Sequence, residues 1–186
     1  MVLPYSRWKV LPRVPAKFAA EMSSLSPLVV QLLYNRGIRN LAEADLFLNP
    51  DERLCSDPFL LIDMDRAVAR IHEALLHEEK MAIYGDFDAD GICGTVLLVQ
   101  GISALGGDVI PYIPHRLEEN RGLSEAGLDK LRRNGVTLVI TVDCGTDSVD
   151  EVEYARDNRS NILITDHHMP MSVFPTAMAI VNPRRG

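Results

Sequence analysis

Short apolar runs alternate with longer helical patterns along the second part of the chain. The apolar runs predict strands at 81–84, 109–113, 136–142, 162–165 and 177–181. The helical patterns cover 92–105, 124–134 and 148–157. Strands that alternate with helices at this spacing are typical of a parallel sheet, and nearly continuous apolar strands indicate that both faces are covered. We therefore predict an α/β fold in which helices flank a parallel sheet.

The first part of the chain shows no strand alternation. Ser26-Pro27 predicts the start of a helix, and a second short helix is predicted over 41–48. The residues expected on one face of the first helix are Leu28, Val29, Leu32 and Leu33. Asp63 is predicted to cap a stronger helix, because the apolar residues after it recur at three- and four-residue spacing.

These patterns divide the chain into two predicted regions. A small helical N-terminal region covers 1–60, and an α/β domain covers 61–186. The last predicted strand is followed by Asn-Pro-Arg-Arg-Gly and by no closing helix. We therefore expect the domain to be truncated at its C-terminal end and the chain to be part of a longer protein.

Composition places the chain among ordinary globular proteins, with 47% apolar and 24% charged residues. No apolar run is long enough to span a membrane, and the N-terminus lacks the apolar core of a signal peptide. Cys55, Cys93 and Cys144 are odd in number and far apart, which argues against a disulfide framework. These features predict a cytoplasmic protein without a membrane partner.

The charge balance is acidic, with 19 basic and 26 acidic residues and a net charge of −7. Such a chain does not hold nucleic acid through its overall charge. A nucleic-acid enzyme is still compatible with this balance, because bound divalent cations can offset the negative field locally.

Acidic residues and histidines follow three of the predicted strands directly. Asp86, Asp88 and Asp90 follow the strand at 81–84, and Asp143 follows the strand at 136–142. A third cluster, Asp166-His167-His168, follows the strand at 162–165. Because the C-terminal ends of parallel strands share one edge of a sheet, where ligands bind, we expect the three clusters to meet.

Carboxylates and imidazoles without thiolates favour Mn²⁺ or Mg²⁺ over Zn²⁺ or Fe²⁺. Several aspartates on one edge can hold two ions about 3.5–4 Å apart, which clamp a phosphoryl group and activate a water molecule. The side chains therefore predict metal-dependent hydrolysis of a phosphoester.

Simpler explanations account for less of the pattern. The spacing of Asp86, Asp88 and Asp90 matches the start of an EF-hand loop, but Leu97 stands where that loop requires a bidentate glutamate. Helix capping explains one aspartate at a strand end better than three in one loop. Alone, His167-His168 could be a surface pair; beside Asp166 at a strand end, a ligand role is favoured.

Three segments together resemble the first three motifs of the DHH phosphoesterases. They are IYGDFDADG at 83–91, TVDCG at 141–145 and TDHHMP at 165–170. Further segments are similar to the RecJ single-strand-specific exonucleases of bacteria, namely FLNP at 47–50, DPFLLIDMDRAVARI at 57–71 and YIPHR at 112–116. The resemblance implies two Mn²⁺ ions, or Mg²⁺, and 5′-to-3′ hydrolysis of single-stranded DNA in recombination and repair.

The resemblance also implies roles for the residues of the three clusters. The metal ligands would be Asp86, Asp88, Asp90, Asp143 and His167. Asp143 would bridge the two ions, His168 would contact the scissile phosphate or a ligand, and Asp166 would orient a histidine from behind. The catalytic residues are therefore expected to be Asp143, His167 and His168.

Arg116 resembles a family arginine that binds substrate phosphate, for which a guanidinium is well suited. The alternative is a surface ion pair with Glu118 or Glu119.

The family has a fourth aspartate motif, followed by two further domains. Neither that motif nor those domains occur in these 186 residues. We therefore expect the isolated chain to bind Mn²⁺ weakly and to be nearly inactive. Partners implied by the family are single-stranded DNA, a helicase and a single-strand-binding protein. Two other functions stay open: a DHH phosphodiesterase for oligonucleotides or cyclic dinucleotides, and a DHH-like scaffold without catalysis.

Overall fold

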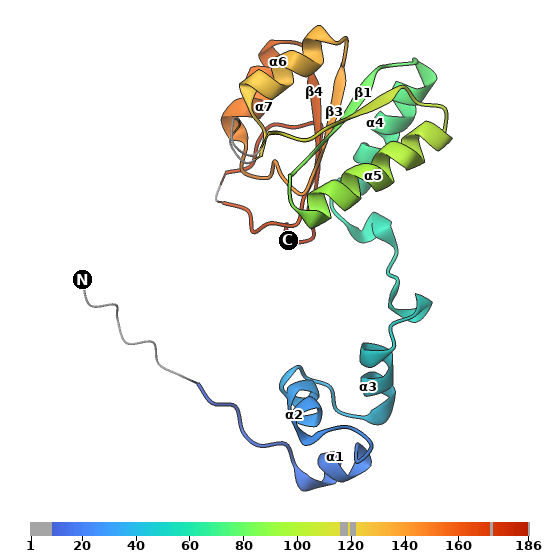
Figure 1. Ribbon diagram of the computed structural model, residues 1–186, viewed down its shortest axis with the longest axis vertical. Helices are drawn as coiled ribbons and strands as arrows, with labels where there is room; N and C mark the ends of the chain where they lie inside the picture. Colours follow the sequence, from blue (N-terminus) through green and yellow to red (C-terminus); the bar gives the residue numbers. More distant parts are fainter. Residues whose placement is uncertain (1–8, 116–118, 120–121, 172, 186) are drawn as a thin grey trace, which may run out of the picture. The chain divides into compact units, whose positions relative to one another are not determined.

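The computed structural model describes residues 9–115, 119, 122–171 and 173–185. The chain forms two compact units, of which the first ends at Ser56 and the second begins at Asp57 (Figure 1). No helix in these described ranges is both long and apolar enough to cross a membrane.

The first unit is a small helical cluster. It contains α1 (Ala16–Glu21), α2 (Pro27–Asn35), α3 (Leu41–Leu48) and the short 3-10 helix η1 (Glu52–Leu54). The Ser26 hydroxyl caps α2 by accepting the N–H of Val29, and Asn40 caps α3 by accepting the N–H of Glu43. The predicted starts of both helices are therefore confirmed.

The predicted apolar face of α2 is only partly buried. Leu28 and Leu32 are 68% and 44% exposed, whereas Val30 and Leu33 are buried. The reason is α1, which the sequence pattern did not predict. Phe18 and Met22, from α1 and its end, join the same core and select the face of α2 that they contact.

The second unit contains a five-stranded parallel sheet with the strand order β2-β1-β3-β4-β5. Its strands are β1 (Met81–Gly85), β2 (Val109–Tyr112), β3 (Leu138–Val142), β4 (Asn161–Thr165) and β5 (Ala179–Val181). β1 and β3 are buried along their whole length, as their unbroken apolar sequences predict.

Helices cover both faces of the sheet. After the 3-10 helix η2 (Pro58–Leu60), α4 (Met64–Leu76) and α5 (Ala89–Ala104) pack on one face. On the other face lie α6 (Glu125–Arg133) and α7 (Val149–Asp157), as Figure 1 shows. The predicted α/β fold is therefore confirmed.

Asp63 does not cap α4 as predicted. Its backbone has a left-handed conformation with φ 62°, and its side chain makes no capping hydrogen bond. Instead, the carboxylate accepts the N–H of Ile180 at 3.1 Å and ion-pairs with Arg185. Asp63 thus ties the start of α4 to β5.

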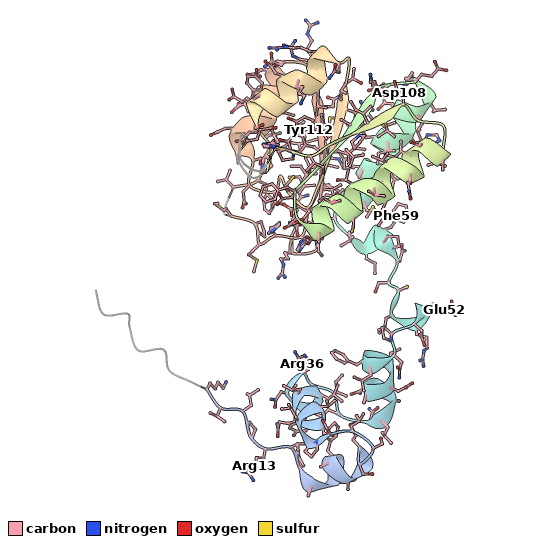
Figure 2. The ribbon with its side chains drawn as sticks, viewed as in Figure 1. Arg13, Arg36, Glu52, Phe59, Asp108 and Tyr112 are labelled. Atoms are coloured by element: carbon pink, nitrogen blue, oxygen red, sulfur yellow. The ribbon has the colours of Figure 1, made fainter. Side chains whose placement is uncertain are left out.

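The topology places a crevice at the C-terminal edge of the sheet. The chain leaves β1 toward β2 but leaves β3 toward β4, so the direction of winding reverses between the adjacent strands β1 and β3. Loops diverge at such a reversal and leave room for a ligand. In Figure 2 the labels Asp108, just before β2, and Tyr112, its last residue, mark the N-terminal and C-terminal ends of this strand.

Candidate metal centre

Three aspartates stand at equivalent positions on three adjacent strands. The last residues of β1, β3 and β4 are Gly85, Val142 and Thr165, and they are partners in register. The residue after each is an aspartate, and its N–H continues the ladder. Asp86 donates to Val142, Asp143 donates to Thr165, and Asp166 donates to Val181. Strand register alone therefore aligns the three carboxylates along one edge.

Asp86 is fully buried beneath the first turn of α5. Its Oδ1 accepts the N–H of Phe87 at 2.7 Å. A Cβ at Gly91 would lie 2.4 Å from the carbonyl oxygen of Asp86, so only glycine permits this approach of helix and strand. The glycine of the motif thus brings the start of α5 onto the end of β1.

The start of α5 supplies two further carboxylates. The helix begins at Ala89, three residues before the predicted start, so Asp90 lies in its first turn. Asp88 is the N-cap and accepts the N–H of Gly91 at 3.3 Å. Asp90 is exposed, and its Oδ2 lies 3.4 Å from Nε2 of His167.

Asp143 combines burial with a left-handed backbone conformation. It is 5% exposed and has a backbone φ of 62°, a conformation that aspartate tolerates better than most residues. Its Oδ1 lies 2.8 Å from Nε2 of His167, whereas its buried Oδ2 has no hydrogen-bond partner among the described residues. Burial, followed by Asp88 and Asp90, raises the pKa of Asp143 to about 6, and His167 opposes that rise.

The carboxylate of Asp166 differs from that of Asp143, because both of its oxygens accept hydrogen bonds from the loops of the site. Oδ1 accepts the N–H of His167 at 2.7 Å and of His168 at 3.1 Å, and Oδ2 accepts the N–H of Thr146 at 3.0 Å. Burial opposes ionisation, but these hydrogen bonds prevail and lower the pKa of Asp166. Nδ1 of His168 lies 2.8 Å from this carboxylate, so the proton of a neutral His168 ring is on Nδ1, where the carboxylate accepts it.

The donor atoms fall into two groups that share one residue. Asp86, Asp88 and Asp143 form one group, and Asp143, His167 and His168 form the other. Within each group the donor atoms lie within 4.8 Å of one another, close to the separation of opposite ligands around one ion with bonds of about 2.2 Å.

These groups fit divalent cations such as Mn²⁺ or Mg²⁺. The unpartnered buried oxygen of Asp143 and the like-charged neighbours that raise its pKa both indicate missing positive charge. Burial raises the pKa of the nearby Cys144 thiol, which donates a hydrogen bond to the carbonyl of Tyr84 at 3.8 Å and belongs to neither donor group. Among the described residues, the donor atoms of the two groups are carboxylate oxygens and imidazole nitrogens.

The structure brings together all of the predicted residues that it describes, which are Asp86, Asp88, Asp90, Asp143, Asp166, His167 and His168. Arg116, the predicted phosphate-binding residue, lies outside the described residues. A cavity of about 510 Å³ opens beside Asp143 and His168 and is also lined by the loop from Gly145 to Ser148.

Sequence reasoning missed two residues behind the centre, Thr146 and Asn182. Both are buried polar side chains, and Asn182 donates to the hydroxyl of Thr146 and to the carbonyl of His168. Asn182 directly follows the last strand, so the rule that aligned the aspartates would also have placed it at this edge.

Several known proteins are similar to this chain in sequence. Residues 80–186 match the family described as "DHH family, N-terminal domain". Over its whole length, the chain is 35% identical to the single-stranded-DNA-specific exonuclease RecJ of Bacillus subtilis and covers 24% of that protein. It is 36% identical over 94% of its length to the RecJ of Thermus thermophilus and covers 25% of it.

Solved structures give the same result. A crystal structure of exonuclease RecJ bound to manganese matches 70% of the chain with a TM-score of 0.65 and 36% identity, covering 34% of that protein. The crystal structure of RecJ from Thermus thermophilus in complex with Mn²⁺ matches 95% of the chain with a TM-score of 0.69 and 30% identity, covering 25% of that protein. The chain thus spans about a quarter of the length of the curated relatives it matches.

Proposed function

This chain belongs to the DHH family, and on that premise we propose that it carries the metal-binding part of a 5′-to-3′ exonuclease for single-stranded DNA. The observation that carries the proposal is the alignment of Asp86, Asp143 and Asp166 in register, with one buried oxygen of Asp143 left without a partner among the described residues. The relatives named as single-stranded-DNA-specific exonucleases support the substrate class.

We assign the ligands of two Mn²⁺ or Mg²⁺ ions from the two groups of donor atoms. Asp86 and Asp88 would hold one ion, His167 would hold the other with Asp90 beside it, and Asp143 would bridge both. With these ions bound, the site gains an activated water and positive charge that offsets the charge developing on the phosphate.

The remaining residues would orient and bind. Asp166 engages Nδ1 of His168, so Nε2 is the nitrogen through which that ring, once protonated, would donate to a phosphate oxygen. Arg116 is proposed to bind a second phosphate oxygen through its forked guanidinium. The cavity beside Asp143 offers room for the nucleotide that carries the scissile bond.

In the cell, we propose that the whole protein acts in the cytoplasm in DNA recombination and repair. Three free cysteines suit a reducing compartment. A helicase would supply its single strands, and a single-strand-binding protein would share its substrate.

Calorimetric titration with Mn²⁺ tests the metal site, and nuclease assays on the full-length protein test the activity. We expect Mn²⁺ binding that Asp143→Ala abolishes, together with degradation of single-stranded but not duplex DNA. Degradation confined to the shortest oligonucleotides would favour the phosphodiesterase alternative. Mn²⁺ binding without any hydrolysis would favour the scaffold.

A further inference from the structure

A buried amide links the last strand to the histidines of the centre. Asn182, the residue after β5, is 1% exposed. Its Nδ2 donates to Oγ1 of Thr146 at 2.9 Å and to the carbonyl of His168 at 3.0 Å. Its Oδ1 accepts the N–H of Arg184 at 2.9 Å. Both amide hydrogens and the amide oxygen are therefore used, each toward a different segment.

These contacts close a ring of four residues. Asn182 bonds to Thr146, the N–H of Thr146 bonds to Asp166, Asp166 bonds to the imidazole of His168, and the carbonyl of His168 bonds back to Asn182. His168 is thus held at both its side chain and its backbone. Rotation of its ring would break the bond to Asp166, and movement of its backbone would break the bond to Asn182.

The turn after β5 that contains Asn182 also bonds to the neighbouring histidine, His167. Nε of Arg184 donates to the carbonyl of His167 at 2.9 Å, and the N–H of Arg184 is fixed by Asn182. The carbonyls of both histidines therefore bond to one short turn after β5. None of these bonds involves the side chain of a proposed metal ligand directly.

We propose that Asn182 is a positioning residue that sets the orientation of His167 and His168 from outside the metal centre. The proposal rests on the function proposed above, since orientation matters only if these rings bind a metal ion or a phosphate. A purely structural asparagine would contribute to stability alone. A positioning residue also fixes which nitrogen of His168 carries the proton, because the bond to Asp166 selects it.

The decisive measurement is the nitrogen-15 spectrum of the imidazoles without metal, followed by Mn²⁺ titration. In the wild-type chain, His168 is expected in a single tautomer with the proton on Nδ1. Asn182→Ala is expected to give a mixture of tautomers and to weaken Mn²⁺ binding about 10-fold, the lower end of the range for outer partners of metal ligands.

Two further variants protect the test against loss of folding. Thr146→Val removes the hydroxyl that accepts from Asn182 but keeps the N–H that donates to Asp166, so it is expected to shift the His168 signals in the same direction. Thr146→Ser keeps the hydroxyl and should match the wild type. If Asn182→Ala does not fold, this pair decides the question.

Asp63→Ala is the control, because Asp63 binds Ile180 of β5 and Arg185 of the following turn through its side chain, but makes no bond to either histidine. It should lower the melting temperature and leave the His168 signals unchanged. The proposal is overturned if Asn182→Ala, or Thr146→Val in its place, behaves like this control. Absence of Mn²⁺ binding in the full-length wild-type protein would instead refute the proposed function, while the tautomer measurement would still judge Asn182.

Discussion

The N-terminal and C-terminal edges of the sheet differ in how their buried charges are paired. At the N-terminal edge, Arg70 is 7% exposed and its Nη2 lies 2.7 Å from Oε2 of Glu79, which also accepts the hydroxyl of Thr137 at 2.8 Å. Its buried Nη1 has no hydrogen-bond partner among the described residues, but the charge of Arg70 is paired with that of Glu79. At the C-terminal edge, the carboxylates of Asp143 and Asp166 lie in register, and no arginine or lysine of the described ranges forms an ion pair with either of them.

The pKa values follow this difference. The hydrogen bond from Arg70 lowers the pKa of Glu79, whereas burial and neighbouring carboxylates raise that of Asp143 to about 6. Charge that serves the fold is neutralised by a partner in the same unit. Charge that remains unbalanced in a crevice indicates a partner from outside, which is the physical basis for the metal centre.

The largest effect is expected from a substitution at the C-terminal edge of the sheet. Asp143→Asn removes the carboxylate shared by both donor groups, so Mn²⁺ affinity should fall by more than about 100-fold, beyond the usual cost of losing an outer partner. Without metal, its melting temperature should not fall, because a repelled buried charge is lost. Calorimetry and thermal unfolding measure the two results. Asp157→Asn, a change at an exposed residue, serves as the control, and equal Mn²⁺ affinity in both variants would contradict the assignment.

The reverse behaviour is expected at the N-terminal edge. Arg70→Met leaves Glu79 without its cation and should destabilise the unit by about 2–3 kcal/mol, less than the full cost of breaking a buried pair because Glu79 keeps some access to water. Mn²⁺ affinity should not change. Denaturant unfolding measures the loss.

Arg66→Met is the matched control on the same helix, because Arg66 is 58% exposed and its ion pair with Asp63 contributes little. If Arg70→Met cost no more than this control, the N-terminal edge would not be a structural ion pair of the kind described.

Gly91→Ala tests whether the close contact of α5 with the end of β1 positions the carboxylates at the C-terminal edge. The added Cβ would meet the carbonyl of Asp86 at 2.4 Å, so the first turn of α5 must shift together with Asp88 and Asp90. We expect a loss of about 1–3 kcal/mol in the free energy of unfolding and weaker Mn²⁺ binding.

Gly101→Ala is the control for this change, because Gly101 lies in the same helix and its Cβ would meet nothing within 4 Å. It should stabilise the chain by about 0.5–1 kcal/mol. Unfolding curves and Mn²⁺ titrations of both variants, side by side, separate a steric effect from a general effect of alanine in α5.

The sequence predicts one part of this comparison better than the other. The aspartates could be placed together because strand direction and register follow from apolar runs, and the residue after each strand then lies at a known edge. The start of α5 could not be predicted correctly, because the apolar pattern begins only at Ile92. Asp88 caps the helix and starts it earlier, at Ala89.

The residues behind the centre were harder to predict for a physical reason. Thr146 and Asn182 carry no charge. Strand position could have placed Asn182 at this edge, but the hydrogen bonds that both residues make depend on how the loops pack. The contact of Arg70 with Glu79 and Thr137 likewise joins separate segments that only the fold brings together.

The smallest expected effect is the pH dependence of the stability that Glu79 contributes at the N-terminal edge. Because the pKa of Glu79 is lowered in the folded chain, its charge stabilises the fold above the ordinary value of 4.5, and that contribution is lost as pH falls through the folded pKa. Glu79→Gln should therefore cost about 1 kcal/mol at pH 7 and progressively less below pH 4.5. Denaturant unfolding of wild type and variant across this range measures the difference. A gap that stayed constant with pH would mean that Arg70 gains only a neutral hydrogen bond from Glu79, and the contrast between the two edges would then rest on Asp143 alone.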